Sequence, residues 1–330
     1  MKQIDRKRRR FTAGAALSLA LPAFHAAARA EAPWPARQIR LVVPFPPGGG
    51  TDTTSRLMAE KMASLGWTVV VDNRPGAAGN IGLDAVAKSA PDGYTIGMGQ
   101  ASNLAINPAL YPTMPFNPLK DFTAIAPISE QPVVLCVRED SPLRTLADFV
   151  REAKANPGKY SIGQAGNGTV GHLAGELLTR RAGIQALQVP YKGAGPAMTD
   201  LLGGQIALNF ANSVSVMSQL QAGKVRGLAV SSARRVPALP NVATVAEQGY
   251  PGFEATTWLG LVGPSGYPAD LVARINRETV KILERPEVVE RLNAEGSVLI
   301  PGTPQQFAEL IQKEHAKWGA LIRDANIKLE

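Results

Sequence analysis

Apolar residues along the chain alternate between short continuous runs and runs spaced as on one face of a helix. Residues 39–43 predict a strand, and in the segment after it Leu57, Met58, Met62 and Leu65 share one helical face. Further strands are predicted at residues 68–71, 94–98, 125–128, 133–137, 160–163, 187–189, 206–210, 225–230 and 256–262, with helices near 145–155, 169–182, 194–203 and 214–222. Continuous apolar strands that alternate with helices predict an α/β fold with parallel sheets covered on both faces.

Helix starts are marked by local signals in two places. Thr145 with Asp148 fits a capping box, and so does Thr303 with Gln306, where Pro304 occupies the first helical turn. From about Pro268 onward the pattern is mostly helical. These signals predict that two helices begin at residues 146 and 304.

The number of strands favours two sheets over one. Two apolar stretches, residues 125–128 and 133–137, are separated by Pro132 and could carry the chain from one domain into another. A return crossing is expected between Val230 and Thr256, in a proline-rich stretch. We therefore expect a discontinuous first lobe of residues 31–130 and 253–330 and a second lobe of residues 131–252, with a cleft between them. One long doubly wound sheet is the alternative.

The basic charge of the chain is concentrated at its start. Residues 1–30 carry seven basic side chains and one acidic one, which leaves only +2 of the net charge of +8 for the rest. This excess therefore does not indicate nucleic-acid binding.

The same thirty residues have the order of a secretory signal. Basic residues 6–10 precede an apolar run at residues 11–24, and small residues follow as far as Ala30. The run is shorter than the roughly 20 residues that span a bilayer. We expect cleavage after Ala30 and export, with an uncleaved membrane anchor as the alternative. Residues 8–11 also match the core of a twin-arginine signal, and the export route stays open.

Side chains suited to catalysis or metal binding are few. The single cysteine, Cys136, excludes a disulfide within the chain and a cysteine zinc site. His25, His172 and His315 are far apart, and no His, Asp or Glu cluster has metal-ligand spacing. There is also no Gly-x-Ser-x-Gly nucleophile motif. We expect binding rather than turnover, and no metal.

Residues 166–171 spell the glycine pattern of a dinucleotide-binding loop. That loop also requires an acidic residue about 20 positions further on, for the ribose hydroxyls. No Asp or Glu lies between Glu176 and Asp200, and no Gly-Lys-Ser/Thr follows any glycine-rich turn. No nucleotide cofactor is expected.

Three glycine-rich loops each follow a strand and open a helix, at residues 44–52, 163–169 and 191–197. The start of a helix exposes unpaired N–H groups and about half a positive charge, and glycine lets a ligand approach the backbone. A tight turn in any α/β protein also needs glycine, which is the alternative for each loop taken singly. Together the three loops predict a shared site for a carboxylate or phosphate.

Several blocks of sequence follow one another in an order typical of one family. They are residues 39–52, 71–79, 107–111, 168–177, 190–202 and 237–252. In this combination the chain resembles the Bug family of TctC-type receptors, the periplasmic solute-binding proteins of tripartite tricarboxylate transporters. The resemblance implies a type II periplasmic-binding-protein fold, with two lobes joined by two crossover strands and a central ligand cleft. It also implies a ligand carboxylate held mainly by backbone N–H groups and ordered waters.

The resemblance also implies a set of ligand-binding residues, carried over by position. In the first lobe these are Phe45, Gly48, Gly49, Thr51, Asp52, Ser102 and Asn103. In the second lobe they are Asn167, Gly168, Thr169, His172, Lys192, Gly193, Pro196, Asn212 and Ser213.

The chain departs from the family pattern at two positions. Ala207 and Ala211 stand where many family members carry aspartate. Without those carboxylates a ligand ammonium group would lose a partner, and a second ligand carboxylate would meet less repulsion. We therefore expect a dicarboxylate or aromatic carboxylate rather than an amino acid.

The expected function is capture of a small carboxylate-bearing solute in the periplasm and its delivery to membrane transporter subunits. The expected receptor is a monomer without a cofactor and is not embedded in the membrane once the signal is removed. Two alternatives are an exported enzyme that uses His172 with Asp52 in the same cleft, and a sensory receptor without a transport role.

Overall fold

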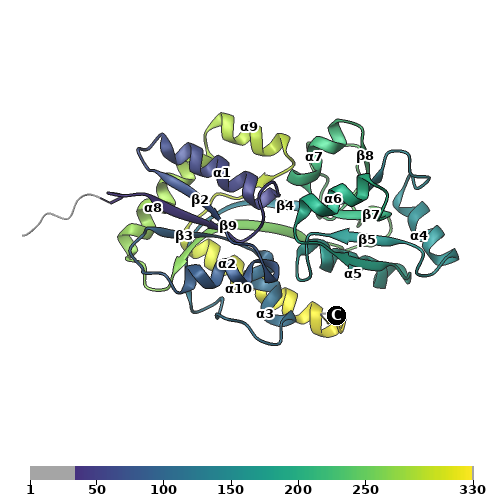
Figure 1. Ribbon diagram of the computed structural model, residues 1–330, viewed down its shortest axis with the longest axis horizontal. Helices are drawn as coiled ribbons and strands as arrows, with labels where there is room; N and C mark the ends of the chain where they lie inside the picture. Colours follow the sequence, from purple (N-terminus) through teal and green to yellow (C-terminus); the bar gives the residue numbers. More distant parts are fainter. Residues whose placement is uncertain (1–33, 329–330) are drawn as a thin grey trace, which may run out of the picture. The chain divides into compact units, whose positions relative to one another are not determined.

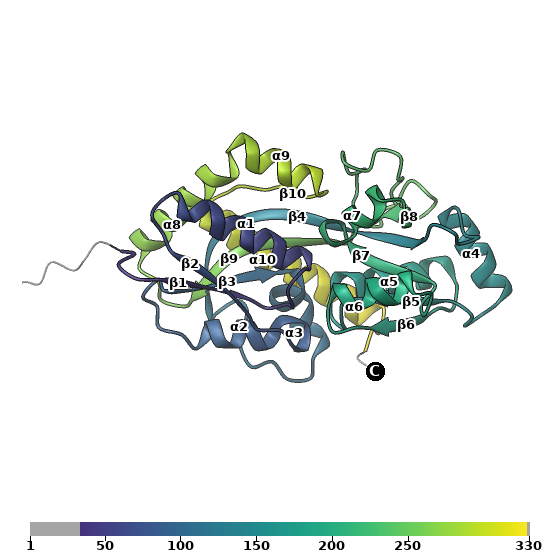
Figure 2. The same ribbon diagram turned by 45° about the horizontal axis from the view of Figure 1, so that its top comes forward.

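The computed structural model describes residues 34–328, so the expected signal and its cleavage site after Ala30 lie outside the described residues. The strands form one connected path in the order β2-β1-β3-β9-β4-β7-β5-β6, and β8 and β10 also pair with β4. In Figures 1 and 2, α1 lies on one side of the strands and α2 on the other. The strands are β1 (Ile39–Val43), β2 (Val69–Asn73), β3 (Thr95–Gln100), β4 (Phe122–Arg138), β5 (Ser161–Gln164), β6 (Leu187–Pro190), β7 (Leu208–Asn212), β8 (Val225–Val230), β9 (Thr256–Pro264) and β10 (Val298–Leu299).

The long strand β4 belongs to two sheets. Its first part pairs with β9 as far as Pro132, and from Val133 onward it pairs with β7 and β8. We call the elements around β1–β3, β9, β10 and the first part of β4 the first lobe, and those around β5–β8 the second lobe. The change between sheets falls beside the expected lobe boundary at residue 130, while the exact boundaries stay a prediction.

Two expectations about strands were wrong. The separate strands predicted at residues 125–128 and 133–137 form the single strand β4. Pro132, which was expected to separate them, lies at the place where β4 changes partners, so its missing N–H group interrupts no continuous ladder. The sheets are also mixed rather than parallel. Parallel pairs join β1 with β2 and β3, and β5 with β6 and β7, whereas β4 is antiparallel to β7, β8, β9 and β10.

Every helix predicted from the sequence is present, with its ends within about two residues of the predicted ones. They are α1 (Gly50–Ala63), α2 (Asn80–Ala87), α3 (Asn107–Leu110), α4 (Leu146–Ala155), α5 (Val170–Ala182), α6 (Ala194–Leu202), α7 (Ser213–Gln221), α8 (Ala269–Leu283), α9 (Pro286–Ala294) and α10 (Pro304–Asp324). Both predicted capping boxes are confirmed, at Thr145 with Asp148 and at Thr303 with Gln306. A π-helical turn at Ser102–Ile106 and helices α2 and α3 were not predicted. No helix within residues 34–328 is both long and apolar enough to cross a membrane.

Separate apolar cores hold the two faces of the first sheet. On one face α1 and α8 pack their apolar stripes, including Met58 and Ile275, against Leu41. On the other face Trp258 of β9 meets Phe307 of α10 edge to face, with ring centroids 5.8 Å apart. Because both faces of the first sheet are covered by helices, polar loops can lie only at the ends of its strands, including the carboxyl ends of β1 and β3. The candidate site lies at those ends.

Candidate ligand-binding site

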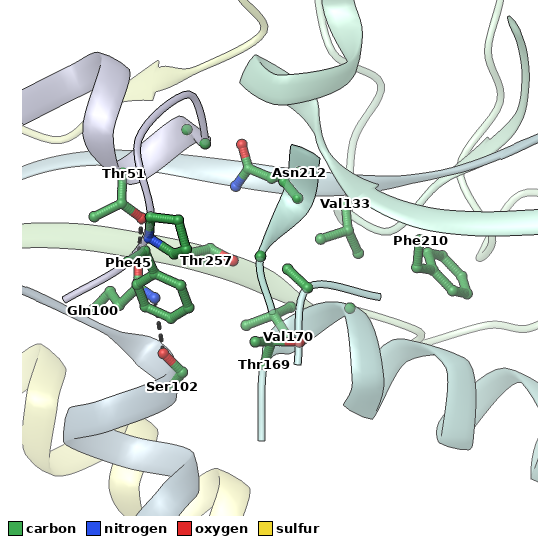
Figure 3. A pocket seen from close by; sticks show the side chains of 17 residues that line it. Phe45, Thr51, Gln100, Ser102, Val133, Thr169, Val170, Phe210, Asn212 and Thr257 are labelled. Carbon is green, nitrogen blue, oxygen red and sulfur yellow. Dashed lines mark hydrogen bonds between the residues drawn. The ribbon is translucent and has the colours of Figure 1, made fainter. Parts of the chain in front are cut away.

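A cavity of about 70 Å³ lies where α1, α5 and α6 begin. A single water molecule needs roughly 10–15 Å³ of such space, so the cavity has room for a small solute. Figure 3 shows side chains from both lobes around it. The lining residues are Phe45, Pro46, Gly49, Gly50, Thr51, Gln100, Ser102, Val133, Ala165, Thr169, Val170, Gly171, Gly193, Ala194, Phe210, Asn212 and Thr257.

Backbone N–H groups at the helix starts are the main donors around the cavity. In α1 the first N–H group that bonds back within the helix is that of Thr53, to the Gly49 carbonyl at 3.0 Å. The N–H groups of Gly50 and Thr51 therefore have no acceptor within the helix. The residue that precedes α1, Gly49, and the one that precedes α6, Gly193, provide no side-chain cap. These donors are available to a ligand oxygen.

The start of α5 is arranged differently, because Thr169 caps it. The Thr169 hydroxyl accepts from the His172 N–H at 3.4 Å and donates to the Gly166 carbonyl at 2.7 Å. The N–H groups of Val170 and Gly171 lie in the first turn, and both residues line the cavity. All three glycine-rich loops predicted from the sequence thus meet at one space.

A hydrogen-bonded chain of three side chains forms the polar wall of the first lobe. The Thr51 hydroxyl donates to Gln100 Oε1 at 2.7 Å, and Gln100 Nε2 donates to Ser102 Oγ at 2.9 Å. Figure 3 shows both bonds as dashed lines beside the ring of Phe45. This arrangement leaves the second amide proton of Gln100 and the hydroxyl proton of Ser102 as donors. Sequence reasoning missed Gln100, although its place at the carboxyl end of β3 was a usable signal.

The rest of the lining is uncharged. Phe45, Val133, Val170 and Phe210 form apolar walls, and Thr257 adds a hydroxyl from β9. No lining side chain carries a charge, so an anion here would meet oriented dipoles rather than a salt bridge.

Seven of the sixteen residues that the resemblance implied line the cavity, and nine do not. Those in the lining are Phe45, Gly49, Thr51, Ser102, Thr169, Gly193 and Asn212. Those outside it are Gly48, Asp52, Asn103, Asn167, Gly168, His172, Lys192, Pro196 and Ser213. The positions of the second group follow from contacts within the protein.

Asp52 is buried beside the loop that precedes α1 instead of facing the cavity. It accepts hydrogen bonds from the Gly48 N–H, from Arg56 and from Asn73, each at 2.9 Å. Burial alone would raise the pKa of Asp52, but the bonds from Arg56, Gly48 and Asn73 outweigh it and lower the pKa. The carboxylate therefore ties the loop to β2 and places its charge away from a ligand.

His172 lies on the far side of the Thr169 turn. Its Nδ1 accepts from the Gly168 N–H at 3.3 Å, and its ring lines a separate cavity of about 320 Å³ with Glu176 and Arg180. Burial lowers the pKa of His172 to about 4, so the ring is neutral at pH 7. Within residues 34–328 neither a hydrogen bond nor a shared cavity joins His172 to Asp52. The acid–base pair of the alternative enzyme hypothesis is not formed.

The remaining residues outside the lining support the loops or face solvent. Asn103 Oδ1 accepts from the Gln100 N–H at 3.1 Å and so fixes the end of β3. The Asn167 carbonyl accepts from the Tyr111 hydroxyl at 3.4 Å, and Ser213 donates to the Gly296 carbonyl at 3.0 Å. Lys192 and Pro196 are exposed.

The two alanines that depart from the family pattern do not line the cavity. Ala211 is buried in a cluster with Met198, Leu201 and Val216, on the opposite face of β7 from its neighbours Phe210 and Asn212. Ala207 packs at the edge of another apolar cluster. The preference against amino acids that was inferred from these positions therefore loses its structural basis.

Comparison with known proteins gives consistent matches along the chain. Residues 54–327 match the family model described as tripartite tricarboxylate transporter family receptor, TctC. The chain is 41% identical over 317 residues to a UPF0065 protein of the tcbD–tcbE intergenic region of Pseudomonas sp. (strain P51), covering 96% of this chain and 94% of that one. It is 38% identical over 299 residues to protein BugT of Bordetella pertussis (strain Tohama I), covering 90% and 92%.

Solved structures resemble the whole described fold. The periplasmic binding protein BugD has a TM-score of 0.85 at 35% identity, covering 90% of this chain and all of that one. Rpa4515 of R. palustris, solved with adipate, has a TM-score of 0.87 at 35% identity, covering 89% and 99%. MatC of Rhodopseudomonas palustris, solved with bound malate, has a TM-score of 0.82 at 33% identity, covering 87% and 99%. The periplasmic-binding-protein fold expected from the sequence is confirmed.

Proposed function

Because the chain belongs to the TctC family of tripartite tricarboxylate transporter receptors, we propose that it captures a small carboxylate-bearing solute between its lobes for delivery to a transporter. The family consists of solute-binding receptors rather than enzymes. The proposal assigns the cavity at the starts of α1, α5 and α6 as the place of capture.

The meeting of three helix starts at a cavity without charged side chains is the observation that carries this proposal. Each helix start presents N–H groups and a partial positive charge, and charge-assisted bonds to a carboxylate are about twice as strong as neutral ones. An ammonium group would find no acidic side chain in the lining. The site therefore favours an anion over a cation.

We infer that the solute is a short aliphatic dicarboxylate. Donors lie on both sides of the cavity: Gln100, Ser102 and the start of α1 on one side, and the starts of α5 and α6 on the other. Phe45 and Val170 provide apolar surface between them, which suits a methylene chain. Two solved relatives hold adipate and malate, which are both aliphatic dicarboxylates.

The proposed place of action is the periplasm. Residues 1–30 would act as the export signal, and cleavage after Ala30 would release the receptor. A transporter that recognises the closed, loaded form would then receive the solute. N-terminal sequencing of the exported protein tests the cleavage, and an intact Met1 would contradict it.

A thermal-shift screen tests the proposed ligand class. Adipate, malate and citrate should be compared with amino acids and with dimethyl adipate, which keeps the chain of adipate but lacks its charges. A dicarboxylate at 100 times its Kd should stabilise the protein by about 2.7 kcal/mol. Equal stabilisation by dimethyl adipate, or stabilisation by amino acids alone, would overturn the proposal.

A variant at the first loop tests whether the ligand binds in this cavity. The backbone of Gly49 is extended (φ −84°, ψ 167°), a conformation that valine adopts readily, and an added Cβ would meet nothing closer than 4.0 Å. Gly49→Val should therefore fold, with a ligand-free Tm lowered slightly because valine is a poorer helix cap than glycine, while its methyl groups fill the cavity and remove the response to dicarboxylate. A full response in this variant would show that the solute binds elsewhere.

An uptake assay tests delivery. Cells that lack the receptor should lose uptake of the bound dicarboxylate and regain it with the wild-type gene but not with Gly49→Val. Normal uptake without the receptor would contradict the transport role and leave the binding result standing.

A further inference from the structure

Three glycines lie where the two lobes touch: Gly50 and Gly193 line the cavity, and Gly168 lies outside its lining. A Cβ atom built on Gly50 would be 2.4 Å from Asn212 Oδ1, and one on Gly168 would be 2.3 Å from Asn107 Oδ1. A Cβ atom on Gly193 would be 2.9 Å from Pro46 Cγ. In each pair one residue belongs to the first lobe and the other to the second, and real Cβ atoms essentially never approach within 3.0 Å.

Gly50 is the most informative of the three, because its backbone does not require glycine. It is the first residue of α1 and has no positive φ, so alanine would fit the helix there. Gly168 and Gly193, in contrast, have φ of +81° and +119°, which glycine tolerates and other residues rarely adopt. At Gly50 only the space beside Asn212 and Gln131 opposes a side chain.

The atoms that face Gly50 are held in place. Asn212 Oδ1 caps α7 by accepting from the Val214 N–H at 3.1 Å. Gln131 is fully buried, and its Nε2 donates to the Thr54 hydroxyl at 3.0 Å, while its Oε1 lies 2.8 Å from the built Cβ of Gly50. An added methyl group would therefore require the Gln131 amide, which belongs to the same lobe as Gly50, to shift. Relief of its contact with Asn212 would in addition require the lobes to move apart or the α7 cap to break.

We propose that the missing side chains at Gly50, Gly168 and Gly193 set how far the lobes close, so that these glycines govern affinity through closure. The inference rests on the proposed function for its link to affinity, and on the contacts between lobes for its geometry. When only part of the population can close, the apparent Kd rises in proportion to the lost closed fraction. Gly50→Ala should therefore weaken binding even though it removes no donor.

A double-mutant cycle between Gly50 and Asn212 isolates the contact between lobes. The four proteins are wild type, Gly50→Ala, Asn212→Gly and the double variant, with glycine chosen because it is tolerated as a helix cap. In the wild-type background Gly50→Ala should raise the Kd for adipate or malate about tenfold or more. In the Asn212→Gly background the same change should raise the Kd less than about threefold, because the Asn212 oxygen in the other lobe is gone, while the contact with Gln131 in the same lobe is present in both backgrounds.

A control variant separates closure from a general effect of alanine at a helix start. Gly195 is exposed in the first turn of α6, lies outside the cavity lining, and has open space around its built Cβ. Gly195→Ala should leave the Kd unchanged. Urea unfolding without ligand shows whether each variant is folded before its Kd is compared.

The distance between the lobes gives a readout that needs no ligand. Spin labels can be placed at Val70→Cys in β2 and Leu187→Cys in β6, which are 41% and 61% exposed in the native protein. The native Cys136 is fully buried and would not compete for the label. Gly50→Ala should shift the interlabel distances toward longer values, and the double variant should restore the wild-type distribution.

The possible failures can be told apart. If adipate and malate do not bind wild type, the proposed ligand class fails, but the label distances still test closure. Unchanged distances in Gly50→Ala would overturn the closure proposal. An equal rise in Kd for Gly50→Ala in both backgrounds would also overturn it. The same holds if the labelled wild type shows no shorter interlabel distance than Gly50→Ala, with or without dicarboxylate.

Discussion

Replacing Gln100 with leucine removes the side chain that connects Thr51 to Ser102 on the polar wall of the cavity. Both hydroxyls then lose a hydrogen-bonding partner in a place where Gln100 is only 4% exposed. A buried polar group left unpaired costs about 1–3 kcal/mol, and leucine recovers part of this through apolar burial. We expect the free energy of unfolding of the ligand-free protein to fall by about 2–4 kcal/mol.

The same substitution removes one donor that the proposed function assigns to the ligand, the second amide proton of Gln100. A hydrogen bond to a charged group contributes about 1.5–3 kcal/mol, which corresponds to a rise in Kd of roughly 10- to 150-fold. The comparison variant is Thr51→Val, because the Thr51 hydroxyl proton is already donated to Gln100. Thr51→Val should lower stability but raise the Kd less than Gln100→Leu does.

Urea unfolding without ligand and calorimetric titration with adipate and malate measure the two effects separately. Titrations are run at a temperature where each variant is fully folded, so that loss of stability does not appear as loss of affinity. An unchanged Kd in Gln100→Leu would refute the assignment of Gln100 as a ligand donor. Equal increases in Kd for both variants would show that the effect comes from losing the bond between Thr51 and Gln100, which both variants remove, and not from a donor on Gln100.

Three further predictions concern titratable groups. Burial lowers the pKa of His172 to about 4. The stability that the neutral ring contributes should be complete above its ordinary pKa near 6.5 and be lost as the pH falls toward 4. Between pH 7 and pH 4.5 the free energy of unfolding, measured in urea, should therefore fall less in His172→Gln than in the wild type. Although burial raises it, the pKa of Asp52 is lowered overall by Arg56, Gly48 and Asn73, so Asp52→Asn should reduce the Tm at pH 7, and its difference from wild type should shrink as the pH falls through that lowered pKa. Burial raises the pKa of Cys136 to about 12, so a maleimide should label the protein in urea but not in its native state.

Local sequence signals predicted the helix starts that build the site. Glycine-rich turns and capping residues act over three or four positions, so the beginnings of α1, α5 and α6 could be placed without tertiary information. The two capping boxes at Thr145 and Thr303 were predictable for the same reason.

Features that depend on distant partners could not be predicted in this way. Pro132 was interpreted as a break between strands, because nothing in the sequence shows that β4 exchanges β9 for β7 and β8 at that residue. The direction of Ala211 depends on the register of β7 against β4, and a shift of one residue would have turned it toward the cavity. Gln100 escaped notice because its role needs Thr51, which lies 49 residues earlier.

In the proposed mechanism, the neutral lining selects a ligand by its charge, and the glycine contacts between the lobes select it by its size. Oriented N–H groups favour any carboxylate, since they bind its charged oxygens and do not contact its carbon chain. Selection by size must then come from closure, because a ligand too long for the cavity would hold Asn212 away from Gly50 and Pro46 away from Gly193. Substitutions at Gly50 should therefore reduce the affinity for every dicarboxylate that fits, whereas substitutions at Gln100 should act most strongly on ligands whose carboxylate reaches the polar wall.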